Sequence, residues 1–185
     1  MKETATELIA QLRSNAVEAF DRLIEQYGDR LYWHIRRVVV QHEETEDVLQ
    51  ETFARAFTSI DDFRGDNESS LIAWLYRIAT NLAINALRKR KRWALASLDS
   101  IRGDLLATFE QESDPSADEI AVRLQKAILA LPTKQRLVFN MRYYDELSFE
   151  QISQATGDSV STLKTNYHYA VKKIKDQVSV IEIEE

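Results

Sequence analysis

Residues 147–175 read "LSFEQISQATGDSVSTLKTNYHYAVKKIK". Within this stretch Ser148 and Gln151 have the spacing of a capping box, which predicts that a helix begins directly after the serine. Gly157 can adopt a positive φ, so this helix is expected to end there, and Ser159 is placed to cap a second helix. Two helices joined by a tight turn that contains glycine form a helix-turn-helix.

The second of these helices has a stripe of apolar residues from Val160 to Ile174 and a polar face opposite it. In a helix-turn-helix the second helix enters the major groove, where hydroxyl, amide and cationic side chains bind base edges or phosphates. An ordinary amphipathic hairpin with a solvated face shows the same spacing, so that alternative stays open. The candidate reading residues are Ser159, Ser161, Thr162, Lys164, Thr165, Asn166, His168 and Lys172.

Composition narrows the fold class and the cellular compartment. The chain is 44% hydrophobic and has four glycines and two prolines, which favours helices over a turn-rich β fold. Without cysteine it has no disulfides, no thiolate metal site and no thiol nucleophile. The first residues lack the apolar core of a signal peptide, and no apolar run reaches the roughly 20 residues that span a bilayer. We therefore expect a cytoplasmic protein without membrane insertion.

Helical periodicity extends over most of the chain. Apolar residues recur at helical spacing over residues 17–39, where Gly28 marks a weak point, and again over residues 49–60. Two shorter amphipathic helices are predicted at residues 120–131 and 133–144, separated by a proline. The spacing therefore predicts helices in both halves.

A longer helix is predicted in the first half, after a polar loop at residues 61–70. Ser69 or Ser70 is expected to cap this helix, which continues to Arg92. Trp74 lies on its apolar stripe, which favours core packing, but stacking on a nucleic-acid base also stays open.

The excess of acid is concentrated in one segment of a chain whose net charge is -6. Residues 94–118 hold one basic and six acidic residues, whereas the segments on either side are close to neutral. Gly103-Asp104 and Asp114-Pro115-Ser116 are turn signals, which indicates a loop that acts as a solvated tether. The predicted fold is therefore all-α, with two small helical domains at residues 1–93 and 119–185 joined by an acidic linker at 94–118.

The end of the long helix gathers five consecutive cations, which are Arg88, Lys89, Arg90, Lys91 and Arg92. One or two cations there would complement the helix dipole, but five repel one another, which indicates an external anion. Nucleic-acid phosphate is the favoured partner, while an acidic protein, a membrane surface and a plain solvated helix end stay open. A helix-turn-helix together with this basic helix end predicts two nucleic-acid contacts in one chain.

Three stretches carry a family resemblance. "EDVLQETFARAF", "FRGDNESSLIAWLYRIATNLAINALRKRKR" and "LPTKQRLVFNMRYYDELSFEQISQATGDSVSTLKTNYHYAVKKIK" together resemble the extracytoplasmic-function (ECF) sigma factors of bacterial RNA polymerase. The resemblance covers about residues 16–92 and 119–177. It implies a factor of the sigma-70 family that binds core polymerase and directs promoter recognition, DNA melting and transcription initiation.

The resemblance also implies partners and roles. Asp47, Gln50 and Glu51 match the helix that docks on the clamp helices of the largest polymerase subunit. The flap of the second-largest subunit is a further expected partner. The cations at 88–92 would touch the backbone of the opening duplex. An anti-sigma factor is a further candidate partner. A loop of the family captures an extruded base of the promoter element near the start site. The residues that match this loop are Phe63, Arg64, Gly65, Asp66, Asn67, Ser69 and Ser70, with Asn81 on the next helix.

The recognition helix at residues 159–175 matches the one that reads the distal promoter element. The family often has an arginine-rich stretch in this helix, whereas this chain has residues 165–170, "TNYHYA". The promoter preference implied by the resemblance is therefore not fixed by these residues.

Enzyme chemistry has little support in the sequence. "HEETED" at residues 42–47 places one histidine among carboxylates that point in different directions on a helix, so no metal site, cofactor or catalytic residue is expected. His34 and His168 have no obvious partners and are expected at the surface or stacked on a ring. A stand-alone DNA-binding regulator and a protein that binds only other proteins remain the alternative functions.

Overall fold

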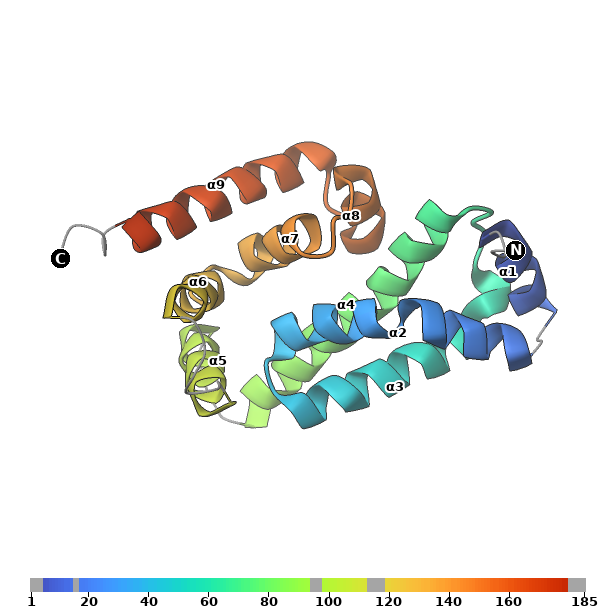
Figure 1. The fold of residues 1–185 in the computed structure, drawn as a ribbon, viewed down its shortest axis with the longest axis horizontal. Helices are drawn as coiled ribbons and strands as arrows, with labels where there is room; N and C mark the ends of the chain where they lie inside the picture. Colours follow the sequence, from blue (N-terminus) through green and yellow to red (C-terminus); the bar gives the residue numbers. More distant parts are fainter. Residues whose placement is uncertain (1–4, 15–16, 94–97, 113–118, 180–185) are drawn as a thin grey trace.

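The computed structural model describes residues 5–14, 17–93, 98–112 and 119–179, and these residues form helices and no strand (Figure 1). In this part of the chain no helix is both long and apolar enough to cross a membrane. The all-α prediction is confirmed. The α-helices are α1 (Ala5–Arg13), α2 (Val17–Val39), α3 (His42–Ser59), α4 (Glu68–Trp93), α5 (Leu98–Glu112), α6 (Glu119–Leu129), α7 (Thr133–Tyr143), α8 (Phe149–Thr156) and α9 (Val160–Ser179), with a short 3₁₀ helix η1 (Ile60–Asp62) after α3.

In the first half, α2, α3 and α4 pack together and α1 lies across one end of them (Figure 1). Their apolar stripes meet in a core that includes Leu23, Leu31, Leu71 and Leu75, each almost fully buried. The expected weak point at Gly28 does not interrupt the backbone, because α2 runs unbroken past it. A single glycine costs a helix only about 1 kcal/mol relative to alanine, and core packing outweighs that cost.

The start of α4 differs from the prediction that Ser69 or Ser70 caps it. The helix begins at Glu68, and the side-chain oxygen of Asn67 accepts a hydrogen bond from the backbone N–H of Ser70 at 2.9 Å. The hydroxyl of Ser70 in turn lies 3.3 Å from the backbone nitrogen of Asn67. Asn67 is therefore the capping residue, and the serine completes the reciprocal pair.

The acidic segment is not a plain loop. Residues 98–112 form α5, so the turn predicted at Gly103 is wrong, whereas the Asp-Pro-Ser signal at 114–116 lies outside the described residues. Leu105 is fully buried against the main core. Glu110 forms an ion pair with Lys126 of α6 at 2.7 Å. Leu106 and Phe109 also pack against this core, so the described part of the segment docks on its neighbours through apolar contacts as well as this ion pair.

The helix-turn-helix has the predicted local geometry. Ser148 and Gln151 form both hydrogen bonds of the capping box at the start of α8. Gly157 ends α8 with φ of 80°, and the hydroxyl of Ser159 accepts a bond from the backbone N–H of Thr162 at the start of α9. These caps satisfy helix-end groups that would otherwise lack partners.

The two halves share one apolar core. α8 lies along α4, and α7 approaches α2 (Figure 1). Leu147, Ile152 and Leu163 of the second half belong to the same buried cluster as Leu71 and Tyr76 of the first half. The chain is therefore closed on itself, with the helix-turn-helix packed on the long helix.

Two glycines provide a matched test of this backbone. Alanine at Gly157 would have open space but a positive φ, and we expect it to cost about 1–2 kcal/mol of unfolding free energy. Alanine at Gly103, inside α5 and equally unobstructed, should stabilise the protein by about 0.5–1 kcal/mol. Urea unfolding of both variants measures the difference. Equal effects of the two substitutions would contradict the described backbone.

Candidate nucleic-acid interface

One face of α4 is polar, basic and exposed. Arg77, Asn81, Asn85 and Arg88 follow one another at intervals of three or four residues, so they share a face of the helix, and all four are exposed. Lys89 beside them is exposed too. The face offers two amides and three cations, which are the donor types that bind phosphate and base edges.

A pocket of about 370 Å³ opens beside this face, between α3 and α4. Trp74 is half-buried there, and its ring lies 4.9 Å from the ring of Phe63, so it packs in the core and borders the pocket at once. The pocket thus combines an aromatic ring with an amide and two guanidinium groups, which could hold a single unstacked base. Its lining residues are Arg55, Thr58, Ser59, Trp74, Arg77, Ile78 and Asn81.

The loop before α4 is held by a contact that the sequence did not indicate. Arg13 of α1 donates to the backbone carbonyls of Phe63 at 3.1 Å and Gly65 at 2.7 Å. A Cβ at Gly65 would clash with the hydroxyl of Ser70 and the ring of Phe63, so only glycine fits there. α1 therefore fixes the shape of this loop.

Of the residues predicted to capture a base, Asn81 lines the pocket, whereas those in the loop at 63–70 do not. Phe63 is buried, Gly65 and Ser70 are half-buried, and Arg64, Asp66, Asn67 and Ser69 are exposed. None of these loop residues lines the pocket beside Asn81. The ring of Phe63 against Trp74 is the contact that joins the loop to the pocket.

The basic residues at the end of α4 do not all face solvent. Arg88 and Lys89 are exposed, whereas Arg90 turns inward, where it forms an ion pair with Glu44 and donates to the carbonyl of Val39 at 3.2 Å. Arg90 thus ties α4 to the start of α3. The side chains of Lys91 and Arg92 lie outside the described residues.

The residues predicted to bind polymerase lie together on α3. Asp47, Gln50 and Glu51 are all exposed on one face of the helix. Glu51 accepts a hydrogen bond from Arg55 at 2.8 Å, one turn further along. Asp47 and Gln50 are exposed as well, so all three side chains are accessible on this face.

The reading face of α9 is exposed although the two halves are closed. Ser161, Thr162, Lys164, Thr165, His168 and Lys172 are exposed, and Ser159 is exposed although its hydroxyl caps the helix. Asn166 alone of the predicted reading residues is half-buried. Closure therefore leaves most of this face accessible.

Asp145, just after α7, is the polar centre of the contact between the halves. Its side chain is 3% exposed and lies 2.8 Å from His34 Nδ1 and 3.1 Å from Arg37 Nη1. Arg30 donates to its backbone carbonyl at 3.1 Å. The other ring nitrogen of His34 lies 2.9 Å from the hydroxyl of Thr80 on α4. This network joins α2 and α4 to the end of α7.

The expectation that His34 lies at the surface is wrong, because the residue is fully buried. Its position between Leu31, Ile35 and Val38 on the apolar stripe of α2 was a signal of burial, and a buried histidine requires partners. The ring of Tyr76 lies 4.7 Å from that of His34. Burial, aided by the nearby charge of Asp145, raises the pKa of Tyr76 above its ordinary value, so its hydroxyl stays neutral.

Comparison with known protein families gives two matches, one in each half of the chain. Residues 23–93 match Sigma-70 region 2, and residues 121–174 match Sigma-70, region 4. The chain is 32% identical over 178 residues to "ECF RNA polymerase sigma factor SigW" of Bacillus subtilis, which covers 92% of this chain and 94% of that protein. It is 31% identical over 182 residues to the "RNA polymerase sigma-H factor" of Pseudomonas aeruginosa, covering 94% of this chain and 93% of that protein.

Solved structures agree in fold. CnrH, in complex with the cytosolic domain of CnrY, superposes with a TM-score of 0.70 and 22% identity, over 96% of this chain and 99% of that one. The sigma factor RpoE of Bartonella quintana, in complex with the anti-sigma factor NepR, gives a TM-score of 0.67 and 20% identity, over 89% of this chain and 99% of that one.

The contact at Asp145 predicts the effect of removing its charge. Asparagine keeps the size of the side chain but leaves the cations of α2 without an anion, and breaking a buried pair in this way costs about 3–5 kcal/mol. We expect Asp145→Asn to shift the protein toward an open arrangement. Because the chain has no cysteine, Asp61→Cys with Asp176→Cys gives two unique dye positions, one on each half.

Energy transfer between the dyes should fall in Asp145→Asn. The matched control is Glu146→Gln, which removes the same charge from the adjacent, exposed position and should leave the transfer unchanged. Equal transfer in both variants would show that the buried carboxylate does not hold the halves together.

Proposed function

Because the chain belongs to the ECF family of bacterial RNA polymerase sigma factors, we propose that it binds core polymerase and directs it to promoter DNA to initiate transcription. The observation that carries this proposal is the order of the two sigma regions, which match residues 23–93 and 121–174, each with a polar helix face exposed. The protein would act in the cytoplasm, where the polymerase transcribes. A catalytic role is not part of the proposal.

The face of α4 is the proposed contact with the promoter element near the start site. Asn81 and the ring of Trp74 border a pocket large enough for an extruded base, and Arg88 and Lys89 follow on the same helix for the phosphates of the opening duplex. The loop at residues 63–70, held in shape by Arg13, would meet the strand next to the pocket. A stand-alone repressor has no need of this second face.

The exposed face of α9 is the proposed contact with the distal element. Ser161, Thr162 and Thr165 near the start of the helix are placed to meet base edges, and Lys164 and Lys172 to meet phosphates. The hydroxyl of Ser159 is engaged in the helix cap, so its proposed contribution is the orientation of the helix.

Polymerase binding is assigned to α3. Asp47, Gln50 and Glu51 present an acidic, exposed patch, which is suited to a basic helical surface such as the clamp helices. The second half would bind the flap of the other large subunit. Because these two attachment points belong to different subunits, we propose that core polymerase draws the halves apart and breaks the contact at Asp145.

The closed form also suggests a route for regulation. Two solved proteins of the same fold are in complexes, one of them with a named anti-sigma factor. We propose that a comparable partner of this chain would stabilise the closed arrangement in which α8 lies on α4.

The direct test is transcription in a purified system. Core polymerase mixed with this protein and a promoter library should produce RNA with specific starts, whereas the free protein should bind duplex DNA weakly. Tight, sequence-specific binding of the free protein without any starts would instead support a stand-alone regulator.

Charge reversal on α3 separates polymerase binding from DNA binding. Asp47→Arg should weaken binding to core by about tenfold or more, which corresponds to at least about 1.4 kcal/mol, and lower transcription accordingly. The control is Asp21→Arg, the same change at an exposed position of α2. Binding measured by fluorescence anisotropy should be unchanged in that control. Loss of core binding in both variants, or in neither, would contradict the assignment to α3.

A further inference from the structure

Arg13, at the end of α1, is bonded to the loop at residues 63–70 through a single nitrogen. Its Nη2 donates to the backbone carbonyl of Phe63 at 3.1 Å and to that of Gly65 at 2.7 Å. The guanidinium carbon also lies 5.9 Å from the centroid of the Phe63 ring. A charged donor makes a stronger hydrogen bond than a neutral one, so these contacts tie the first part of the loop to α1.

The helix that carries Arg13 is a firm support, because its apolar face is buried. Leu8, Ile9 and Leu12 of α1 are each 2% exposed or less, and all three belong to the main core of the protein. Thr6 of the same helix donates a hydrogen bond to the backbone carbonyl of Asp66 at 3.3 Å. α1 therefore holds three successive parts of the loop by their backbone carbonyls.

The loop is also shaped from within. The carboxamide of Asn67 accepts a hydrogen bond from the backbone N–H of Ser70 at 2.9 Å and donates one to the carboxylate of Asp66 at 2.9 Å. At Gly65 the hydroxyl of Ser70 and the ring of Phe63 leave no room for a Cβ. Asn67 and Ser70 are thus engaged in the shape of the loop, and that shape depends on its attachment to α1.

The ring of Phe63 connects this loop to the pocket beside α4. The residue is buried, and its ring centroid lies 4.9 Å from that of Trp74, whose indole borders the pocket. Arg13 contacts both the carbonyl and the ring of Phe63. Two packed rings therefore join Arg13 to the pocket wall, and such a chain of contacts can carry a coupling between the two places.

We propose that Arg13 is a positioning residue for promoter recognition, which holds the loop and the ring pair of Phe63 and Trp74 in the arrangement that accepts an extruded base. Arg13 itself touches no base. It acts by ordering the loop before DNA binds, so less conformational entropy is lost when the base is captured. This inference rests on the proposed function, in which the loop and the pocket meet the promoter element near the start site.

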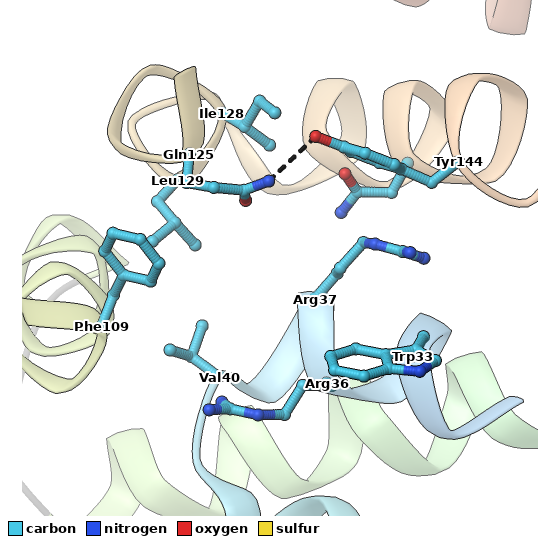
Figure 2. A pocket seen from close by; sticks show the side chains of 10 residues that line it. Trp33, Arg36, Arg37, Val40, Phe109, Gln125, Ile128, Leu129 and Tyr144 are labelled. Carbon is cyan, nitrogen blue, oxygen red and sulfur yellow. Dashed lines mark hydrogen bonds between the residues drawn. The ribbon is translucent and has the colours of Figure 1, made fainter. Parts of the chain in front are cut away.

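The contact at Arg13 is separate from the junction of the two halves. That junction surrounds a cavity of about 300 Å³, where Arg37 lies over the ring of Tyr144 at 4.4 Å to the centroid (Figure 2). The hydroxyl of Tyr144 accepts a hydrogen bond from Gln125 at 2.9 Å (Figure 2). None of the described residues of α1 or of the loop lines this cavity. A change at Arg13 should therefore leave the closed arrangement intact.

The ordering of the loop is tested on the free full-length protein by amide hydrogen exchange. Arg13 is exposed, so Arg13→Met opens no cavity, keeps an apolar stem and removes both hydrogen bonds. Exchange over residues 63–70 should become at least about threefold faster, while the melting temperature stays nearly the same. In Arg13→Lys one nitrogen can again donate to both carbonyls, so most of the protection should return. Equal exchange in all three proteins would overturn the proposed role of Arg13.

The effect on base selection is measured with core polymerase and a promoter found in the library assay. Templates that lack one base at a time in the element near the start site show where the unchanged protein requires a base. At that position the preference for the intact template should fall at least about fivefold in Arg13→Met and recover in Arg13→Lys. Affinity for the abasic template and for core polymerase should not change. The control Arg123→Met removes a cation that is 40% exposed on α6, and should keep the full preference.

The outcomes distinguish this inference from the proposed function. Absence of specific starts with the unchanged protein would overturn the proposed function itself. Specific starts with an equal base preference in Arg13→Met and the unchanged protein would overturn only the inference. An equal loss of affinity on intact and abasic templates would do the same, because it would show that Arg13 supports the fold without positioning the loop for a base.

Discussion

The carboxylate of Asp145, which is 3% exposed, meets the buried ring of His34 and the partly buried guanidinium group of Arg37, both on α2. Taking charges out of water is costly, and this cost is recovered only when every member of the network keeps its partner. Partial separation of the halves is therefore unfavourable, because it would leave the carboxylate of Asp145 buried without its partners. The apolar packing of α8 on α4 adds affinity, while the network fixes one arrangement.

This closed arrangement has a specific consequence for function. The acidic face of α3, the basic face of α4 and the reading face of α9 all remain exposed, so closure does not act by covering them. If the proposed DNA contacts are correct, closure would act by fixing the distance and angle between two surfaces that a promoter requires at separate points. The proposed attachment to two polymerase subunits would supply binding energy to both halves, and that energy would offset the loss of the Asp145 network.

Local signals in the sequence predicted local structure well. The capping box of Ser148 and Gln151, the left-handed Gly157 and the cap at Ser159 are confirmed, because each depends on groups only a few residues apart. Asn67 was missed as a cap because Ser69 and Ser70 beside it are equally good cap formers.

Contacts between residues far apart in the chain could not be predicted from the sequence. His34 and Asp145 are 111 positions apart, and the residues around each one do not indicate that the other is its partner. The inward turn of Arg90 toward Glu44 has the same origin, since the run of cations looks uniform until the helix is packed. α5 was predicted to be a loop because its charge and its glycine outweighed the few apolar residues that dock it, among them Leu105, Leu106 and Phe109.

The most direct measurement is energy transfer between dyes on the two halves of the otherwise unchanged protein. It is recorded while core polymerase is added, and it shows whether polymerase separates the halves at Asp145. Energy transfer should be high in the free protein and should fall to a plateau as polymerase binds. Transfer that stays high in a polymerase complex that initiates specific transcripts would contradict it, because the contact at Asp145 would then persist in the working form.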